Sequence, residues 1–206
     1  MRKPQRNIPL RGLISTTAGI ILLGFLLGVL QKWLDSTASN HLPELLQQLD
    51  FRNYFGRLAI WMLLGTVLSV CSPTPLWAAI HTFCFFISML AGYYLYCNYV
   101  LGFLPRRYMQ MWIVISCFSF LMAYVCWYAK GKGIVAVFLS SLILGCLLAQ
   151  AVNLGRDGFY VYHFLEVLTW LAGVILLRRK PKEYAMELGL SIAVAFVYQL
   201  VIPHWG

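Results

Sequence analysis

An acid and a histidine lie three residues apart in an apolar stretch near the C-terminal end of the sequence. Glu166 stands in the segment HFLEVLTWLAG, and His163 precedes it. A carboxylate inside a membrane helix costs roughly 2–3 kcal/mol or more, so we expect Glu166 to face a bundle interior or a wet cavity. On one helical face, the two side chains could share a proton, hold a cation or bind a polar ligand. Alternatively, a protonated Glu166 only hydrogen-bonds a neighbouring helix.

A second candidate pair is His81 and Cys84, which are also three residues apart. A thiolate next to an imidazole can act as a nucleophile, as in membrane cysteine peptidases. The sequence places no orienting acid or amide nearby. An interfacial histidine beside a cysteine that only fills space is therefore the simpler interpretation.

Motifs that would name a reaction are missing. The sequence has no Walker A loop, no GxSxG and no HExxH, and its six cysteines form no CxxC pair. We therefore predict no metal site, no cofactor and no disulfide framework.

The composition indicates a membrane protein. Of the residues, 61% are hydrophobic and 11% are charged, whereas soluble domains have roughly 45–50% and about 25%. The net charge of +9 comes from basic residues at the ends of apolar runs. This placement favours a topological role and attraction to lipid headgroups over binding of nucleic acid.

The predicted fold is all-α, a single integral membrane domain over residues 1–206 with a polytopic bundle of about seven transmembrane helices. Each apolar run approaches the ~20 residues that cross a ~30 Å hydrocarbon layer. Uninterrupted runs of this kind satisfy their backbone groups as helices. The predicted spans cover residues 12–34, 54–70, 76–97, 108–128, 134–151, 159–177 and 184–202.

Small residues predict where two of these helices pack closely. Gly24 and Gly28 form a GxxxG motif in the first span, with Gly19 nearly on the same face. A second ridge of small residues in the fifth span consists of Ser141, Gly145 and Ala149. Between the first two spans, residues 41–49 are expected to form a short interfacial helix.

The distribution of basic residues predicts an N-terminus inside and a C-terminus outside. Of the sixteen Lys and Arg residues, ten fall on the N-terminal side of the predicted bundle and six on the other. Glu183 and Glu187 are expected to complement the start of the last helix and the adjacent RRKPK turn. The outer side carries several arginines that either attract an anionic solute or, as we favour, bind lipid phosphates: Arg52, Arg57, Arg106, Arg107 and Arg156.

Residues 93–133, with the motifs GFLPRRY and CWYAKGKG, resemble a family of small bacterial multi-pass membrane proteins of unknown function. The resemblance implies a location in the bacterial cytoplasmic membrane. It implies no activity and assigns no functional residues.

The leading hypothesis is a protein that binds or transports a small solute, alone or as a subunit of a larger assembly. The site would lie at Glu166 and His163, with Arg52, Arg106, Arg107 and Arg156 near its mouth. A membrane-embedded enzyme acting on a lipid or peptide through His81 and Cys84, or through the Glu166 pair, is a less favoured alternative. The third is a non-catalytic scaffold or immunity-type protein. The expected partners are membrane lipids, a small solute, and a membrane protein or a second copy of the chain.

Overall fold

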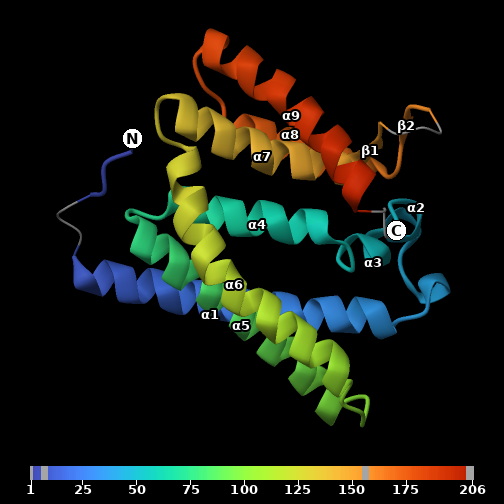
Figure 1. Ribbon diagram of the computed structural model, residues 1–206. Coiled ribbons are helices and arrows are strands. Elements are labelled where there is room, and N and C mark those ends of the chain that lie inside the picture. Colours follow the sequence, from blue (N-terminus) through green and yellow to red (C-terminus); the bar gives the residue numbers. More distant parts are fainter. Residues whose placement is uncertain (1, 6–8, 155–157, 203–206) are drawn as a thin grey trace.

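The computed structural model describes residues 2–5, 9–154 and 158–202 (Figure 1). Within these ranges the chain is almost entirely helical, and its strands form one short antiparallel pair. In this pair Val152 lies opposite Val161, and Asn153 lies opposite Tyr160. The chain is therefore all-α in architecture, as predicted.

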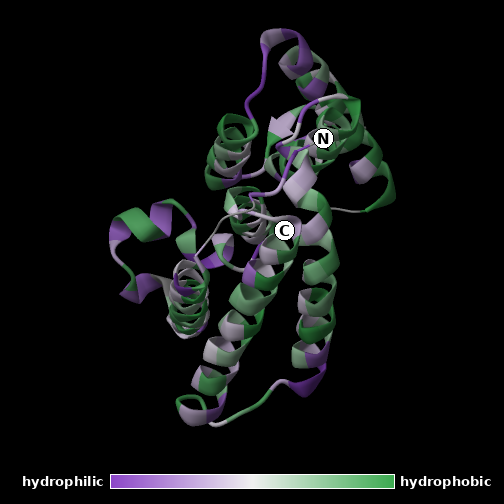
Figure 2. Cartoon of the chain, turned by 90° about the vertical axis from the view of Figure 1, so that its left-hand side faces the viewer, coloured by the Kyte–Doolittle hydropathy of each residue, from purple (hydrophilic) through white to green (hydrophobic). Residues whose placement is uncertain are grey.

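Among the described residues, five helices are long and apolar enough to cross a membrane: α1 (Leu10–Ser36), α5 (Pro75–Tyr99), α6 (Arg106–Ala129), α7 (Ile134–Ala151) and α9 (Pro181–Val201). Hydrophobic residues predominate along these helices (Figure 2). On α6, for example, Phe118, Leu121 and Met122 are exposed. Water would not tolerate so much exposed apolar surface, whereas lipid solvates it. The chain is a multi-pass helical membrane protein.

The other two apolar helices, α4 (Leu58–Cys71) and α8 (Phe164–Leu176), have 14 and 13 residues. At 1.5 Å per residue each is only about 20 Å long, less than a ~30 Å hydrocarbon layer. Five of the seven predicted spans are thus long helices, and two are shorter than predicted. The inside–outside orientation stays a prediction.

The two short helices begin later than predicted for local reasons. The second span was expected from residue 54, but Phe51–Tyr54 forms a separate helix, α3, and a turn at Gly56 precedes α4. The sixth was expected from residue 159, but β2 (Tyr160–Val161) pairs with β1 (Val152–Asn153) and holds the chain extended there. Hydropathy does not distinguish an apolar strand from an apolar helix.

Helices α1 and α5 pack backbone to backbone, as the GxxxG motif predicts. A Cβ atom at Gly24 would collide with Phe85 and Ser88, and one at Gly28 would collide with the carbonyl oxygen of Met89. Gly19 has no neighbour at this distance. The close approach therefore involves Gly24 and Gly28 of α1, and Gly92 of α5, where a Cβ atom would collide with the carbonyl oxygen of Phe25.

The small-residue ridge of α7 faces α9. A Cβ atom at Gly145 would collide with Val194, and Ser141 donates a hydrogen bond to the carbonyl oxygen of Glu187 over 3.1 Å. Ala149 is buried, and its carbonyl oxygen accepts a hydrogen bond from Gln199. Helix α7 is thus the inner helix of this half of the bundle.

The connections gather at two ends of the bundle (Figure 1). We call the end that carries the α4–α5, α6–α7 and α8–α9 turns the N-terminal end, because the chain starts there. The opposite end carries η1 (Ser39–His41), α2 (Glu44–Gln48), α3 and the strand pair. A short helix was expected over residues 41–49, and α2 lies within that range.

Candidate functional site

Glu166 lies in the first turn of α8 and is buried, with 1% of its surface exposed. Its Oε1 atom accepts a hydrogen bond of 2.7 Å from Nη1 of Arg57. Arg57 occupies the N-cap position of α4, so the ion pair joins the starts of the two short helices. Glu166 therefore lies near one end of its helix, whereas the predicted span placed it well inside.

Arg57 also forms an ion pair with Asp50. Asp50 precedes α3 with a φ of 52°, in the left-handed region that Asp tolerates better than most residues. Its side chain is 39% exposed and accepts a hydrogen bond of 2.7 Å from Asn53. We call Asp50, Arg57 and Glu166 the acid–arginine cluster; it runs from the surface to the buried start of α8.

The cluster contains two carboxyl groups and one guanidinium group. Arg57 bonds both carboxyl groups, so one acid is left in excess within the cluster. The other oxygen of Glu166, Oε2, is buried and has no hydrogen-bond partner in the described part of the chain. A buried oxygen of this kind is costly unless a proton or a ligand satisfies it.

A second hydrogen bond joins the segment before α4 to α8. The hydroxyl of Tyr54 lies 2.6 Å from Oγ1 of Thr169 on α8. Thr169 donates its own proton to the carbonyl oxygen of Leu165 over 2.8 Å, so Tyr54 must be the donor. Asp50, Tyr54 and Thr169 were missed in the sequence because nothing in their spacing links them to Glu166.

His163 is the N-cap residue of α8, with extended backbone angles (φ −149°, ψ 144°). It therefore precedes the helix and does not share a helical face with Glu166, contrary to the prediction. The cause is the strand pair, which keeps the chain extended up to this point. The His163 side chain is half-buried.

The arginines predicted to form a mouth have different positions. Arg52 donates to the carbonyl oxygen of Asp35, near the end of α1, over 3.1 Å. Arg106 and Arg107 are exposed at the start of α6, and Arg156 lies outside the described residues. The arginine that bonds Glu166 is Arg57, which was predicted on the same side of the bundle but not at the mouth.

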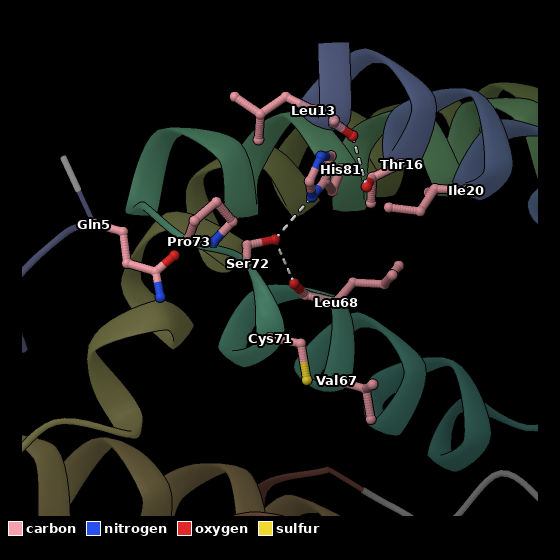
Figure 3. A pocket seen from close by; sticks show the side chains of 11 residues that line it. Gln5, Leu13, Thr16, Ile20, Val67, Leu68, Cys71, Ser72, Pro73 and His81 are labelled. Carbon is pink, nitrogen blue, oxygen red and sulfur yellow. Dashed lines mark hydrogen bonds between the residues drawn. The ribbon is translucent and has the colours of Figure 1, made fainter. Parts of the chain in front are cut away.

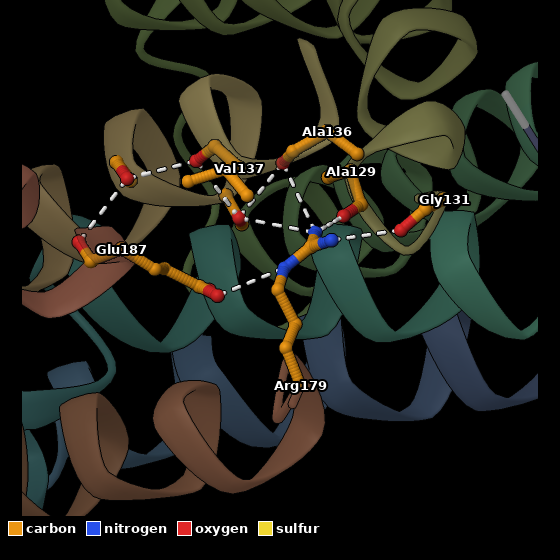
Figure 4. Close-up of polar contacts among 8 residues, drawn as sticks. Ala129, Gly131, Ala136, Val137, Arg179 and Glu187 are labelled. Carbon is orange, nitrogen blue, oxygen red and sulfur yellow. Dashed lines mark hydrogen bonds and ion pairs between the residues drawn. The ribbon is translucent and has the colours of Figure 1, made fainter. Parts of the chain in front are cut away.

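A second buried ion pair lies at the N-terminal end (Figure 4). It joins Arg179, in the turn between α8 and α9, to Glu187 of α9. Nε of Arg179 is 2.8 Å from Oε2 of Glu187, and the side chains are 5% and 0% exposed. Arg179 also donates to the carbonyl oxygens of Ala129, Gly131 and Ala136. Arg179 therefore supplies hydrogen-bond donors to carbonyl oxygens at the end of α6 and in the α6–α7 turn, which is a structural role.

His81, on α5, donates or accepts a hydrogen bond of 2.9 Å between Nδ1 and Oγ of Ser72. Its ring also contacts Trp77, with centroids 5.4 Å apart. The described hydrogen bond of the imidazole is thus to a serine and not to Cys84, which is half-buried three residues further along α5.

No known protein family, curated protein or solved structure matches this chain. The resemblance over residues 93–133 and the bacterial location therefore stay predictions. The established description is a multi-pass helical membrane protein.

Of the two buried ion pairs among the described residues, the one in the acid–arginine cluster combines an excess carboxyl with contacts that extend to the surface. Oε2 of Glu166 and both carboxylate oxygens of Glu187 lack a hydrogen bond among the described residues, although Oε2 of Glu187 lies in the ion pair with Arg179. Glu187 is enclosed completely, whereas Glu166 connects through Arg57 to the exposed Asp50. Across the described ranges, no three His, Cys, Asp or Glu side chains gather closely enough to hold a metal ion.

Proposed function

We propose that this membrane protein binds a small cationic solute, or a proton, at the acid–arginine cluster and transports it. The observation that carries the proposal is Oε2 of Glu166, a buried oxygen without a hydrogen bond in a cluster with one carboxyl in excess. A cation or proton supplies the missing partner and balances the charge. An anion offers only further lone pairs and is disfavoured.

The helices around the cluster support this function. Acids within membrane bundles commonly mark ion or proton pathways. Unusually short apolar segments mark binding sites in many transporters, because a helix end then lies within the protein. Both short helices, α4 and α8, begin at this cluster.

Arg57 makes reversible binding feasible. A buried carboxylate without a counter-charge would hold a cation too tightly to release it, or would stay protonated. Arg57 already offsets one of the two acids, so the remaining charge is small. Asp50, which is partly exposed, provides a first contact for an entering cation.

Thermal unfolding of the purified protein in detergent tests the proposal. The chlorides of Li⁺, Na⁺, K⁺ and ammonium are compared with choline chloride at constant ionic strength. A cation that binds the native state raises its unfolding free energy, by about 2.7 kcal/mol at a hundred times the Kd. We expect Glu166→Gln to abolish the shift and Glu44→Gln, at an exposed acid of α2, to retain it.

A proton as the solute requires a second measurement. Protein in liposomes is given a pH step, and the charge movement is recorded as a current. The wild type is expected to give a current that Glu166→Gln and Asp50→Asn each remove. No current and no cation shift in the wild type, with a Glu166→Gln variant that is merely less stable, would instead establish the cluster as a scaffold contact.

A further inference from the structure

A separate cavity lies at the N-terminal end, between α1, α4 and α5 (Figure 3). Its volume is about 520 Å³, within the range of small-molecule sites. Leu13 and Ile20 of α1 form one apolar wall, and Val67 and Leu68 of α4 form the other. Ser72 and His81 supply polar atoms between these walls.

The hydrogen bonds of Ser72 fix the tautomer of His81. Ser72 donates its hydroxyl proton to the carbonyl oxygen of Leu68 over 2.7 Å. Its oxygen can then only accept from the imidazole, 2.9 Å away, so Nδ1 of His81 carries the proton. Nε2 of the neutral ring is left with a lone pair and no proton.

This lone pair has no partner. His81 is 2% exposed, and its Nε2 atom makes no hydrogen bond within the described ranges. In Figure 3 the ring nitrogen that is not bonded to Ser72 points toward α1. A buried acceptor in a cavity wall selects a ligand that brings a proton donor.

The remaining lining excludes charged ligands. No acidic residue lines the cavity among the described residues, so a cation finds no counter-charge there. A carboxylate or phosphate group without a proton presents only lone pairs to Nε2. The complementary group is therefore an uncharged donor, such as a hydroxyl.

The position of the cavity favours a membrane lipid as the ligand that supplies this hydroxyl group. Helix α1 packs mainly along α5, and much of its surface faces the lipid. His81 follows the first residue of α5 by six positions, about 9 Å along the axis. This position lies nearer the end of the span than its middle, on the side where the lipid headgroups begin.

We propose that the cavity binds an uncharged membrane lipid with a free hydroxyl group, of the diacylglycerol class. The hydroxyl donates to Nε2 of His81, and the apolar chains lie between Leu13 and Ile20 of α1 and Val67 and Leu68 of α4. Ser72 is a positioning residue that holds the ring in the accepting tautomer. This site is distinct from the acid–arginine cluster and does not depend on its function.

Two lipids that differ only in whether they carry a free hydroxyl group test the proposal. Purified protein in detergent is titrated with 1,2-dioctanoylglycerol and with its 3-acetyl ester, and thermal unfolding reports binding. In the wild type, the free alcohol is expected to bind about tenfold more tightly, the factor that one hydrogen bond of about 1.4 kcal/mol provides. Equal affinity for the two lipids, or binding of neither, would overturn the proposal without any variant.

Two variants then test whether His81 is the residue that accepts this hydrogen bond. His81→Leu is expected to bind both lipids equally weakly, whereas His41→Leu, at an exposed histidine of the opposite end, retains the tenfold preference. Ser72→Ala frees the ring to protonate either nitrogen, so the preference is expected to fall while binding of the ester persists. A preference that survives in folded His81→Leu would contradict the assignment.

Discussion

The hydroxyl of Tyr54 donates a 2.6 Å hydrogen bond to Thr169, a residue 115 positions further along the chain. This contact and the Arg57–Glu166 ion pair tie the segment before α4 to the first turns of α8. The chain therefore attaches both short helices to each other at their starting ends. The cluster is held by a neutral contact as well as a charged one.

Removing the hydroxyl in Tyr54→Phe is expected to lower the unfolding free energy by about 1 kcal/mol, the net contribution of one hydrogen bond. Thr169 keeps its bond to Leu165, so no donor is left unsatisfied. Thermal unfolding in detergent measures the change. Tyr99→Phe, at a residue that is highly exposed, serves as the control, and an equal loss in both variants would rule out a role for the contact.

Gly28→Ala is expected to destabilise the protein by about 1–3 kcal/mol, because the new methyl group forces α1 away from the Met89 carbonyl of α5. Gly19→Ala adds the same group to the same helix where nothing lies within 4 Å. It is expected to leave the unfolding free energy unchanged or slightly higher. If both variants unfold alike, α1 does not pack on α5 in this way.

Arg179→Met is expected to cost about 3–5 kcal/mol, because it leaves the carboxyl of Glu187 buried without its partner. Arg178→Met, at the exposed neighbour, is expected to change little. The double variant Arg179→Met, Glu187→Leu should recover part of the loss. Recovery remains incomplete because the carbonyl oxygens of Ala129 and Gly131 still lose their donor.

The orientation of the bundle is tested by cysteine labelling in a cysteine-free background. Lys130→Cys lies in the α6–α7 turn, at the N-terminal end, and Asn98→Cys lies near the opposite end of α5. Both positions are exposed. With the N-terminus inside, an impermeant maleimide labels only Asn98→Cys in intact cells and labels both after permeabilisation. The reverse pattern would invert the predicted topology.

The sequence predicts what depends on local composition. The apolar runs locate the seven apolar helices of the described residues, and Gly24, Gly28 and Gly145 mark faces that pack closely, whereas Gly19 does not. These features are encoded within single segments and do not depend on residues far away in the sequence.

The sequence does not predict which polar groups meet. Glu166 is recognisable as an acid in an apolar run, but its partner Arg57 lies 109 positions earlier, beside other arginines with the same local pattern. The strand pair that displaces His163 depends on two-residue segments too short to recognise by periodicity. The accepting tautomer of His81 depends on Ser72, across a turn that the sequence marks only as CSPTP.

The brevity of α4 and α8 also affects how the membrane voltage acts. The two helices contact each other, and each is only about 20 Å long. If the apolar barrier beside them is this thin, the electric field there is stronger than across the full hydrocarbon layer. A charge that passes along this pair gains the full electrical work, about 2.3 kcal/mol per 100 mV, over a path shortened by roughly a third.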